Sequence, residues 1–355
     1  MDITDRAEIA RPGEEIDVNV VQSFLKIHIP DLDNEIQIFQ FPSGYSNLTY
    51  LIVAGDRQWV LRRPPVGADI TSGHDMAREY KVLTSLYRVF PRCPRPLAFT
   101  EDTSLIGSPF FIMEKLSGII LRKDLPKGFS YSPDQARRLC ENLVDTLVDI
   151  HSIDMKAADL DSIGRPQGYV QRQVHGWTER YGRAKTPDAP DFESVMAWLA
   201  DKMPKDTDTP SMVHNDYKID NLVLSPDHPE KITGILDWEM ATYGDPLMDL
   251  GKSLAYWVEK DDPQDMQLMR TMPTNMDGAL TRKEILERYA RKTGRDTDQF
   301  DFYYCFGLFR LAVIAQQIYN RYYRGITKNK RFAMLIFGVT ALEKAAKNLM
   351  ESSRL

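Results

Sequence analysis

The chain has 355 residues, of which 43% are hydrophobic and 27% charged; at roughly 150 residues per domain, about two domains with sizeable cores are expected. Lys and Arg number 45 against 51 Asp and Glu, which leaves a formal net charge of -6. This acidic balance argues against a general nucleic-acid binder, because such proteins are usually basic. The composition also excludes collagen-like, disordered and disulfide-scaffold proteins.

The three cysteines, Cys93, Cys140 and Cys305, are odd in number and show no paired spacing. Two of them fall within apolar helical patterns, which predicts small buried side chains in a reducing cytoplasm. Residues 1–15 are polar and acidic and lack the apolar centre of a signal peptide. The most apolar long stretch, 303–315, is too short to cross a bilayer. We therefore expect a cytoplasmic protein with neither a membrane nor a nucleic-acid partner.

The N-terminal part of the chain alternates short apolar runs with polar turns, which is typical of a sheet. The polar segment 42–47 separates the first two runs, and Pro64 and Pro65 end the third. The predicted strands are Ile36–Phe41, Leu48–Val53, Gln58–Arg62 and Phe110–Met113, and the predicted helix is Asp75–Tyr87.

Helical periodicity dominates the rest of the chain. Ser132 is a capping residue and Pro133 occupies a first helical position, so together they predict a helix start. The predicted helices are Ser132–Ile153, Glu193–Met203, Asp245–Val258, Lys283–Thr293, Phe302–Tyr323 and Phe332–Met350. The change from strands to helices predicts two lobes, residues 1–114 and residues 115–355.

The residues most informative about chemistry flank two short apolar runs. Asp216 and Asn221 precede the run 222–224, and Asp237 ends the run 232–236. We expect the two runs to pair as a hairpin, which brings Asn221 and Asp237 to one edge. An amide and a carboxylate at that edge are hard oxygen ligands for Mg²⁺, while Asp216 accepts a proton from a hydroxyl. Phosphoryl transfer needs both a metal site and a separate proton acceptor.

Several motifs carry a family resemblance. The segments His214-x-Asp216-x4-Asn221, Ile235-Leu236-Asp237 and Gly244-Asp245-Pro246-x-x-Asp249-Leu250 resemble the aminoglycoside phosphotransferase branch of the protein-kinase-like fold. Three further segments are similar to phosphotransferase domains associated with acyl-CoA dehydrogenases: Val60-Leu61-Arg62-Arg63-Pro64-Pro65, Tyr169-x-x-Arg172-Gln173-x-x-x-Trp177 and Asp237-Trp238-Glu239. The resemblance covers most of the chain.

The resemblance implies an α+β, protein-kinase-like fold with two lobes. The smaller lobe would hold an antiparallel sheet and one helix, and the larger lobe would be mainly helical. It also implies an ATP-dependent phosphotransferase in which Asp216 is the catalytic base and Asn221 and Asp237 bind Mg²⁺. Asp249 is expected to brace the catalytic loop, and His214 to pack beneath it.

The resemblance implies that ATP binds between the two lobes and that the smaller lobe supplies its nucleotide-binding sheet and helix. Glu79 would orient a phosphate-binding cation on the third strand, where Arg62 stands in place of the usual lysine. Alternation puts Val60 on the same strand face, where it would line the adenine pocket. An arginine is always charged and binds phosphate in a bidentate manner. The other predicted nucleotide contacts are the glycine-poor turn Ser43, Gly44, Tyr45, Ser46 and Asn47 and the linker Met113, Glu114, Lys115 and Leu116.

Basic residues are concentrated in two helical segments expected to flank the acceptor, 165–185 and 301–330. Most of them belong on solvated helix faces, but we expect Arg172 and Arg310, with Trp177, to contact the acceptor. A basic site favours an anionic acceptor such as a CoA thioester. The resemblance implies the hydroxyl of a hydroxyacyl-CoA, and a functional link to an acyl-CoA dehydrogenase-like protein.

Two alternatives stay open at this point. An aminoglycoside or other small-alcohol kinase would need an acidic acceptor pocket if its acceptor is a polycation. A non-catalytic nucleotide-binding scaffold would account for the arginine at position 62, but it would not need Asp216, Asn221 and Asp237 together. Singly, each of these three residues also fits an ordinary turn or strand-end position.

Overall fold

The computed structural model describes residues 7–42, 47–65 and 74–355 of the chain. These residues form two compact units, each described by itself below. Unit 1 comprises Met1–Ile120, Lys156–Leu160 and Asn221–Ala241, and unit 2 comprises Leu121–Met155, Asp161–Asp220 and Thr242–Leu355. The segment Asn221–Ala241 thus belongs to the same compact unit as the N-terminal part of the chain. The single lobe boundary after residue 114 stays a prediction.

Unit 1 is built around a five-stranded sheet in which every neighbouring pair is antiparallel, with the strand order β1-β2-β3-β5-β4. Its strands are β1 (Gln37–Gln40), β2 (Leu48–Ala54), β3 (Arg57–Arg63), β4 (Pro96–Thr100) and β5 (Phe110–Glu114). The four strands predicted from the sequence are present. The sequence did not predict β4, in which a proline and a bulge interrupt the alternating pattern.

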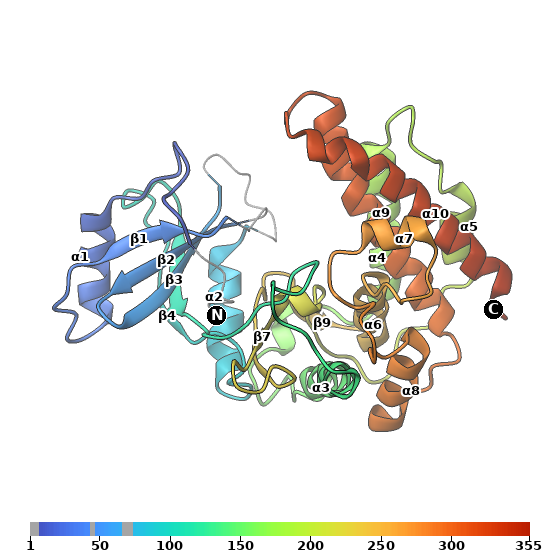
Figure 1. Cartoon of the computed structure of the whole chain (residues 1–355), viewed down its shortest axis with the longest axis horizontal. Coiled ribbons are helices and arrows are strands. Elements are labelled where there is room, and N and C mark those ends of the chain that lie inside the picture. Colours follow the sequence, from blue (N-terminus) through green and yellow to red (C-terminus); the bar gives the residue numbers. More distant parts are fainter. Residues whose placement is uncertain (1–6, 43–46, 66–73) are drawn as a thin grey trace. The chain divides into compact units, whose positions relative to one another are not determined.

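One face of the sheet is covered by α1 (Val18–His28) (Figure 1). Val21 and Leu25 of this helix share a core with Ile52 of β2 and Leu61 of β3. The sequence did not predict α1, because its three β-branched valines favour a strand pattern over a helical one. Its start is fixed instead by Asp17, whose side chain accepts a hydrogen bond from the backbone of the helix.

The other face of β3 carries the side chains that matter for the site. Trp59 and Leu61 belong to the core under α1, so alternation places Val60 and Arg62 on the opposite face, as the sequence predicted. There Arg62 reaches α2 (Met76–Tyr87), the helix predicted at this position. Asp75 caps α2 by accepting a hydrogen bond from Arg78 N–H.

A second, two-stranded sheet in unit 1 confirms the predicted hairpin. Its strands β7 (Leu222–Leu224) and β8 (Ile232–Ile235) pair antiparallel, with Leu222 opposite Ile235. One residue beyond that pair, Leu236 N–H donates to the carbonyl of Asn221 at 2.8 Å. Asn221 and Asp237 therefore leave the hairpin at the same end.

Unit 2 is mainly helical, as predicted, with one small ladder, β6 (Ser211–Val213) paired with β9 (Thr242–Gly244). The predicted start of α3 is confirmed, because Ser132 forms a reciprocal capping box with Gln135. The longest helix, α9, packs side by side with α10 (Figure 1). The helices are α3 (Pro133–His151), α4 (Tyr169–Ala184), α5 (Glu193–Asp201), α6 (Pro246–Ala255), α7 (Gln264–Met269), α8 (Arg282–Thr293), α9 (Phe300–Tyr323) and α10 (Leu335–Ser352).

Two glycines let α6 and α9 approach each other closely. A Cβ added to Gly251 would lie 2.3 Å from the carbonyl oxygen of Tyr303, and one added to Gly307 would lie 2.2 Å from that of Gly251. Any larger residue would overlap backbone, so this crossing requires glycine on both helices. The crossing sets the distance between the site residues on α6 and those on α9.

The cysteines are buried and unpaired, as expected of small apolar side chains. Burial raises the pKa of Cys140 to about 12. Within the described parts of the chain, no helix combines the length and apolar character that a bilayer crossing requires.

Candidate active site

In unit 2, the loop that carries Asp216 begins directly after β6 and is fixed from α6. Asp249, one turn into α6, accepts a hydrogen bond from His214 N–H on Oδ2 and one from Asn215 N–H on Oδ1, each at 2.7 Å. The structure therefore gives Asp249 the bracing role predicted for it. His214 is fully buried and accepts a hydrogen bond from Asp216 N–H on Nδ1, which places it beneath the loop as predicted.

Asp249 performs this role as a carboxylate. Burial opposes its charge, but the hydrogen bond with His151 and the charge of Lys252 outweigh burial and lower the pKa of Asp249 to about 2. His151 lies 3.2 Å from Asp249 Oδ2 and 2.7 Å from the hydroxyl of Tyr289. Asp249 is ionised at neutral pH, so it can accept both backbone hydrogen bonds of the loop.

Asn215, the residue before Asp216, is held by three further side chains. Its Oδ1 accepts hydrogen bonds from Lys252 Nζ at 2.6 Å and from the hydroxyl of Tyr169 at 3.0 Å. Its carbonyl accepts one from Arg310 Nη2 at 3.2 Å. Asn215 has a φ of 68°, a conformation that asparagine adopts more readily than most residues. These contacts fix the backbone from which Asp216 projects.

Lys252 is a buried cation that gives a pH-dependent test of this arrangement. Burial lowers the pKa of Lys252 to about 7, and Arg310 adds to the shift. An unfolded chain would hold the Lys252 proton up to pH 10.4 or so, about the ordinary pKa of lysine. Between these values the unfolded state binds more protons, so Lys252 makes the protein more stable as the pH rises.

We expect Lys252→Met to lose this rise. In urea unfolding between pH 7 and 9.5, the free energy of unfolding of the wild type should climb relative to the variant by up to about 1.4 kcal/mol per pH unit. Lys283→Met, at an exposed lysine of α8, is the control and should follow the wild type. Parallel curves for Lys252→Met and the wild type would contradict the low pKa.

Asp216 itself is partly exposed at the end of this braced loop. Its side chain is 19% accessible, and Lys218 Nζ lies 3.4 Å from Asp216 Oδ2 and 3.5 Å from Asp220 Oδ2. Lys218 also lies over the ring of Tyr256. The loop therefore presents a fixed, accessible carboxylate beside a cation, an arrangement suited to taking a proton near a phosphoryl group.

Unit 1 contains the second cluster of site residues, gathered around Arg62. Arg62 Nη1 donates to Glu79 Oε1 at 2.8 Å, and Nη2 donates to Glu239 Oε2 at 2.9 Å. Both nitrogens also lie 3.2 Å from Asp237 Oδ1. The predicted contact between Arg62 and Glu79 is thus present, and it is buried rather than a surface ion pair.

Three carboxylates surround one guanidinium in this cluster, which leaves a formal charge of -2 if all are ionised. Burial alone would lower the pKa of Arg62, but Glu79, Asp237 and Glu239 outweigh it and raise that pKa. Burial raises the pKa of Glu79 to about 7. Burial, with the nearby charge of Asp237, raises the pKa of Glu239 to about 8. A cation added to this cluster would relieve the excess negative charge.

The predicted metal ligands fit a hard cation. Asp237 has a φ of 68° and a side chain that is 33% accessible, the most exposed carboxylate of the cluster. Glu79 Oε2 is buried and has no hydrogen-bond partner among the described residues, so the cluster has unused oxygen ligands. No set of three or more His, Cys, Asp or Glu suited to a metal occurs in the described residues. Two protein ligands are typical of Mg²⁺, which also binds substrate phosphates and water.

The other predicted nucleotide residues lie in unit 1. Val60 is paired with Met113 across β3 and β5, and Glu114 ends β5 just before Lys115 and Leu116. Asn47 is buried, and its side-chain amide donates to Glu239 and accepts from His74 if that ring nitrogen carries the proton. Ser43, Gly44, Tyr45 and Ser46 lie outside the described residues.

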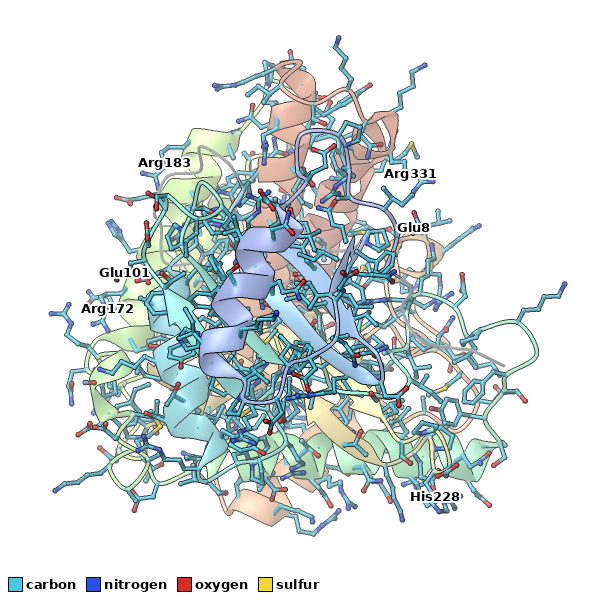
Figure 2. All side chains as sticks on the ribbon, turned by 90° about the vertical axis from the view of Figure 1, so that its left-hand side faces the viewer. Glu8, Glu101, Arg172, Arg183, His228 and Arg331 are labelled. Carbon is cyan, nitrogen blue, oxygen red and sulfur yellow. The ribbon has the colours of Figure 1, made fainter. Side chains whose placement is uncertain are left out.

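The three predicted acceptor residues differ in their surroundings. Trp177 of α4 is buried, with the guanidinium of Arg180 4.7 Å from its ring centre and that of Arg310 5.1 Å from it. Arg310 is also buried and contacts the loop that carries Asp216 by donating to the carbonyl of Asn215. Arg172 is exposed and projects outward from α4 (Figure 2), where it donates to the carbonyls of Arg165 and Gln167.

Several residues of these clusters were not predicted as site residues from the sequence, among them Lys218, Glu239, Lys252 and Arg180. A signal existed for two of them. Glu239 lies two residues after Asp237, and Lys252 is a charged residue within the apolar run of α6, three positions after Asp249. No sequence signal separates Arg180 from the other basic residues of its segment.

Comparison with curated proteins finds relatives that are longer than this chain. It is 31% identical over 332 residues to acyl-CoA dehydrogenase family member 11 of Rattus norvegicus, covering 92% of this chain and 42% of that protein. It is 36% identical over 288 residues to family member 10 of Mus musculus, covering 81% of this chain and 26% of that protein. The chain therefore spans less than half the length of these relatives.

Among solved structures, a protein from Ralstonia eutropha assigned to the aminoglycoside phosphotransferases superposes with a TM-score of 0.81 at 27% identity, covering 96% of this chain and all of that one. This likeness confirms the predicted α+β, protein-kinase-like fold with an antiparallel-sheet lobe and a helical lobe.

The sequence profile described as the phosphotransferase enzyme family matches residues 37–300. Kinases of this family use ATP, and the enzyme class predicted from the sequence, an ATP-dependent phosphotransferase, is confirmed. The match covers well over half of the length of the chain, and the chain therefore belongs to the phosphotransferase enzyme family.

Proposed function

We propose that this phosphotransferase moves the γ-phosphoryl group of ATP to the hydroxyl of a hydroxyacyl-CoA. The kinase activity follows from the family and from the ordered set Asp216, Asn221 and Asp237. The choice of acceptor depends on a different observation, the two arginines whose guanidiniums lie over the ring of Trp177.

Asp216 is proposed as the base. The acceptor oxygen forms a bond to the γ-phosphorus, the bond from that phosphorus to the oxygen bridging it to the β-phosphate breaks, and ADP leaves. The hydroxyl proton passes to a carboxylate oxygen of Asp216, which is accessible and fixed by the contacts of His214 and Asn215. Lys218, 3.4 Å from that carboxylate, offsets negative charge near the transferred group.

The nucleotide-binding sheet and helix are proposed to lie in residues 1–114, and catalysis and acceptor binding in 115–355. Val60 would line the adenine pocket, and the backbone of Met113, Glu114, Lys115 and Leu116 would pair with the base. Arg62, oriented by Glu79, would hold phosphate oxygens.

Magnesium would be held by Asn221 and Asp237 at the end of the β7–β8 hairpin. When bound, it would neutralise charge on the transferred phosphate. The accessible carboxylate of Asp237 and the three carboxylates gathered around Arg62 support this assignment.

The acceptor site is proposed to be basic. The guanidiniums of Arg180 and Arg310 both lie against the ring of Trp177, and the pKa of Arg180 is lowered by burial and then by the charges of Arg183 and Arg310. No described carboxylate lies within ion-pair distance of Arg180. Two cations packed around one indole would be stabilised by an anionic ligand, such as the phosphates of CoA. The names of the curated relatives, acyl-CoA dehydrogenase family members, agree with an acyl-CoA acceptor.

An aminoglycoside acceptor is the second candidate, favoured by the assignment of the Ralstonia eutropha protein. It would place a polycation beside Arg180, Arg183 and Arg310, which like-charge repulsion opposes. The family resemblance to phosphotransferases is common to both candidates, so the two differ only in the acceptor.

We expect Arg180→Gln to raise KM for a hydroxyacyl-CoA by about tenfold, because a lost charge-assisted contact of this kind costs roughly 1.5 kcal/mol. KM for ATP should stay within about twofold of the wild type. Arg172→Gln should act in the same direction but more weakly, since its guanidinium also binds backbone carbonyls. Initial rates of ADP release, with each substrate varied in turn, check this.

Arg291→Gln, at an exposed arginine of α8, removes the same charge elsewhere and should leave both constants unchanged. Higher salt should weaken the acceptor interaction of the wild type, because exposed charges are screened over about 8 Å at physiological ionic strength. Efficient phosphorylation of kanamycin with no activity on CoA thioesters would refute the acceptor and leave the kinase assignment intact.

A further inference from the structure

Arg62 contacts three carboxylates, and their arrangement is not symmetric. A guanidinium carries two N–H groups on each terminal nitrogen. Glu79 uses one N–H of Nη1 and Glu239 uses one of Nη2, at 2.8 and 2.9 Å. Asp237 Oδ1 is 3.2 Å from both nitrogens, so it occupies the fork formed by the remaining pair of N–H groups.

We propose that Glu239 is a second anchor of Arg62: together with Glu79 it holds the outer edges of the guanidinium, so that the central fork faces the phosphates of ATP. This inference rests on the proposed function, in which Arg62 binds phosphate. A phosphate oxygen would take the position that Asp237 Oδ1 occupies, and Asp237 would be released toward the metal.

The two anchors, Glu79 and Glu239, are more deeply buried than Asp237, the partner that a phosphate oxygen would replace. The side chains of Glu79 and Glu239 are 2% and 10% accessible, whereas that of Asp237 is 33% accessible. The anchors also make the shorter contacts with Arg62. Asp237 can therefore leave the guanidinium for a ligand that enters from solvent, while Glu79 and Glu239 stay in place.

Glu239 is itself fixed from two directions. Its carboxylate accepts a hydrogen bond from Asn47 Nδ2 at 2.6 Å, and its backbone carbonyl accepts one from Arg78 Nη1 at 2.9 Å. Asn47 ends the predicted phosphate turn, and Arg78 precedes Glu79 on α2. Glu239 thus connects Arg62 to Asn47 and to Arg78 of α2.

This arrangement accounts for the arginine that replaces the usual lysine. A lysine offers a single nitrogen, which cannot hold two carboxylates on opposite edges and present a planar fork between them. The second anchor is useful only to an arginine. Glu239 and Arg62 are therefore expected to act as a coupled pair, and that coupling is measurable.

The test compares the affinities of ATP and adenosine by calorimetry in the wild type, Glu239→Gln, Arg62→Lys and the double variant. We expect Glu239→Gln to weaken ATP by at least about tenfold while adenosine changes by less than about twofold. In the Arg62→Lys background, Glu239→Gln should add less than about twofold. Glu101→Gln, at an exposed carboxylate of unit 1 labelled in Figure 2, is the matched control and should bind both ligands like the wild type.

An unchanged ratio of ATP to adenosine affinity in Glu239→Gln, or an equal loss in both backgrounds, would overturn the anchor and leave the proposed function standing. A wild type that binds ATP no better than adenosine would overturn the proposed function and this inference with it. Urea unfolding shows whether each variant is folded. If Glu239→Gln does not fold, Asn47→Ser removes the hydrogen bond that the Asn47 amide donates to the Glu239 carboxylate. This variant should still lower the ratio of ATP to adenosine affinity severalfold, and an unchanged ratio refutes the anchor.

Discussion

Replacing Asp216 with asparagine should lower kcat by about 10²- to 10⁴-fold and leave ATP affinity nearly unchanged. A general base contributes a factor of this size, and asparagine keeps the shape of the side chain but accepts no proton. The loop should keep its conformation, because the side chains of Asp249 and His214 accept hydrogen bonds from backbone N–H groups of residues 214–216, which the substitution leaves in place. Steady-state rates of ADP release and calorimetry with ATP give the two quantities.

Asp227→Asn is a suitable control, because Asp227 is an exposed residue in the turn of the β7–β8 hairpin. It makes the same chemical change close by in the sequence and should behave as the wild type does. If Asp216→Asn turned over at the wild-type rate, Asp216 would have no part in the proton transfer. An equal loss of ATP affinity and turnover would instead indicate a role in binding.

Asp237→Asn should abolish the effect of Mg²⁺ on ATP binding. The substitution removes the full charge of a proposed ligand but tolerates the positive φ of this position, since asparagine adopts that conformation readily. Turnover should fall by more than the 10- to 100-fold or so that loss of an outer-shell metal partner costs. Calorimetric titration of ATP with and without Mg²⁺ measures the coupling directly.

Asp56→Asn, in the exposed turn between β2 and β3, is the control for this experiment and should keep the full magnesium effect. The same coupling in Asp237→Asn as in the wild type would remove Asp237 from the metal site. A loss of ATP affinity without Mg²⁺ would point to its contact with Arg62 instead.

The hairpin that carries the proposed metal ligands could be predicted because its information is local. Two apolar runs, a short turn and polar residues at their ends fix which residues share an edge. The face of β3 that carries Arg62 follows in the same way from alternation. In each case a few neighbouring residues contain the whole pattern.

Long-range partners could not be predicted in this way. Glu239 is 177 residues from Arg62, and Lys252 is 37 residues from Asn215. No periodicity connects such positions, so only the folded chain reveals them. Arg310 illustrates the same limit: its aromatic neighbours were evident in the sequence, but its burial against the catalytic loop was not.

The glycine crossing of α6 and α9 has a consequence for how this enzyme can change. Even a single methyl group at Gly251 would overlap the backbone of Tyr303, so an alanine there must push one helix away. Lys252 follows Gly251 on α6 and Arg310 lies on α9 one turn after Gly307, and both bind Asn215. A separation of the helices would therefore draw the two contacts apart and loosen the backbone before Asp216. We therefore expect turnover to depend on side-chain volume at Gly251, a position that carries no functional group. Even the smallest substitution there, alanine, is expected to disturb the site.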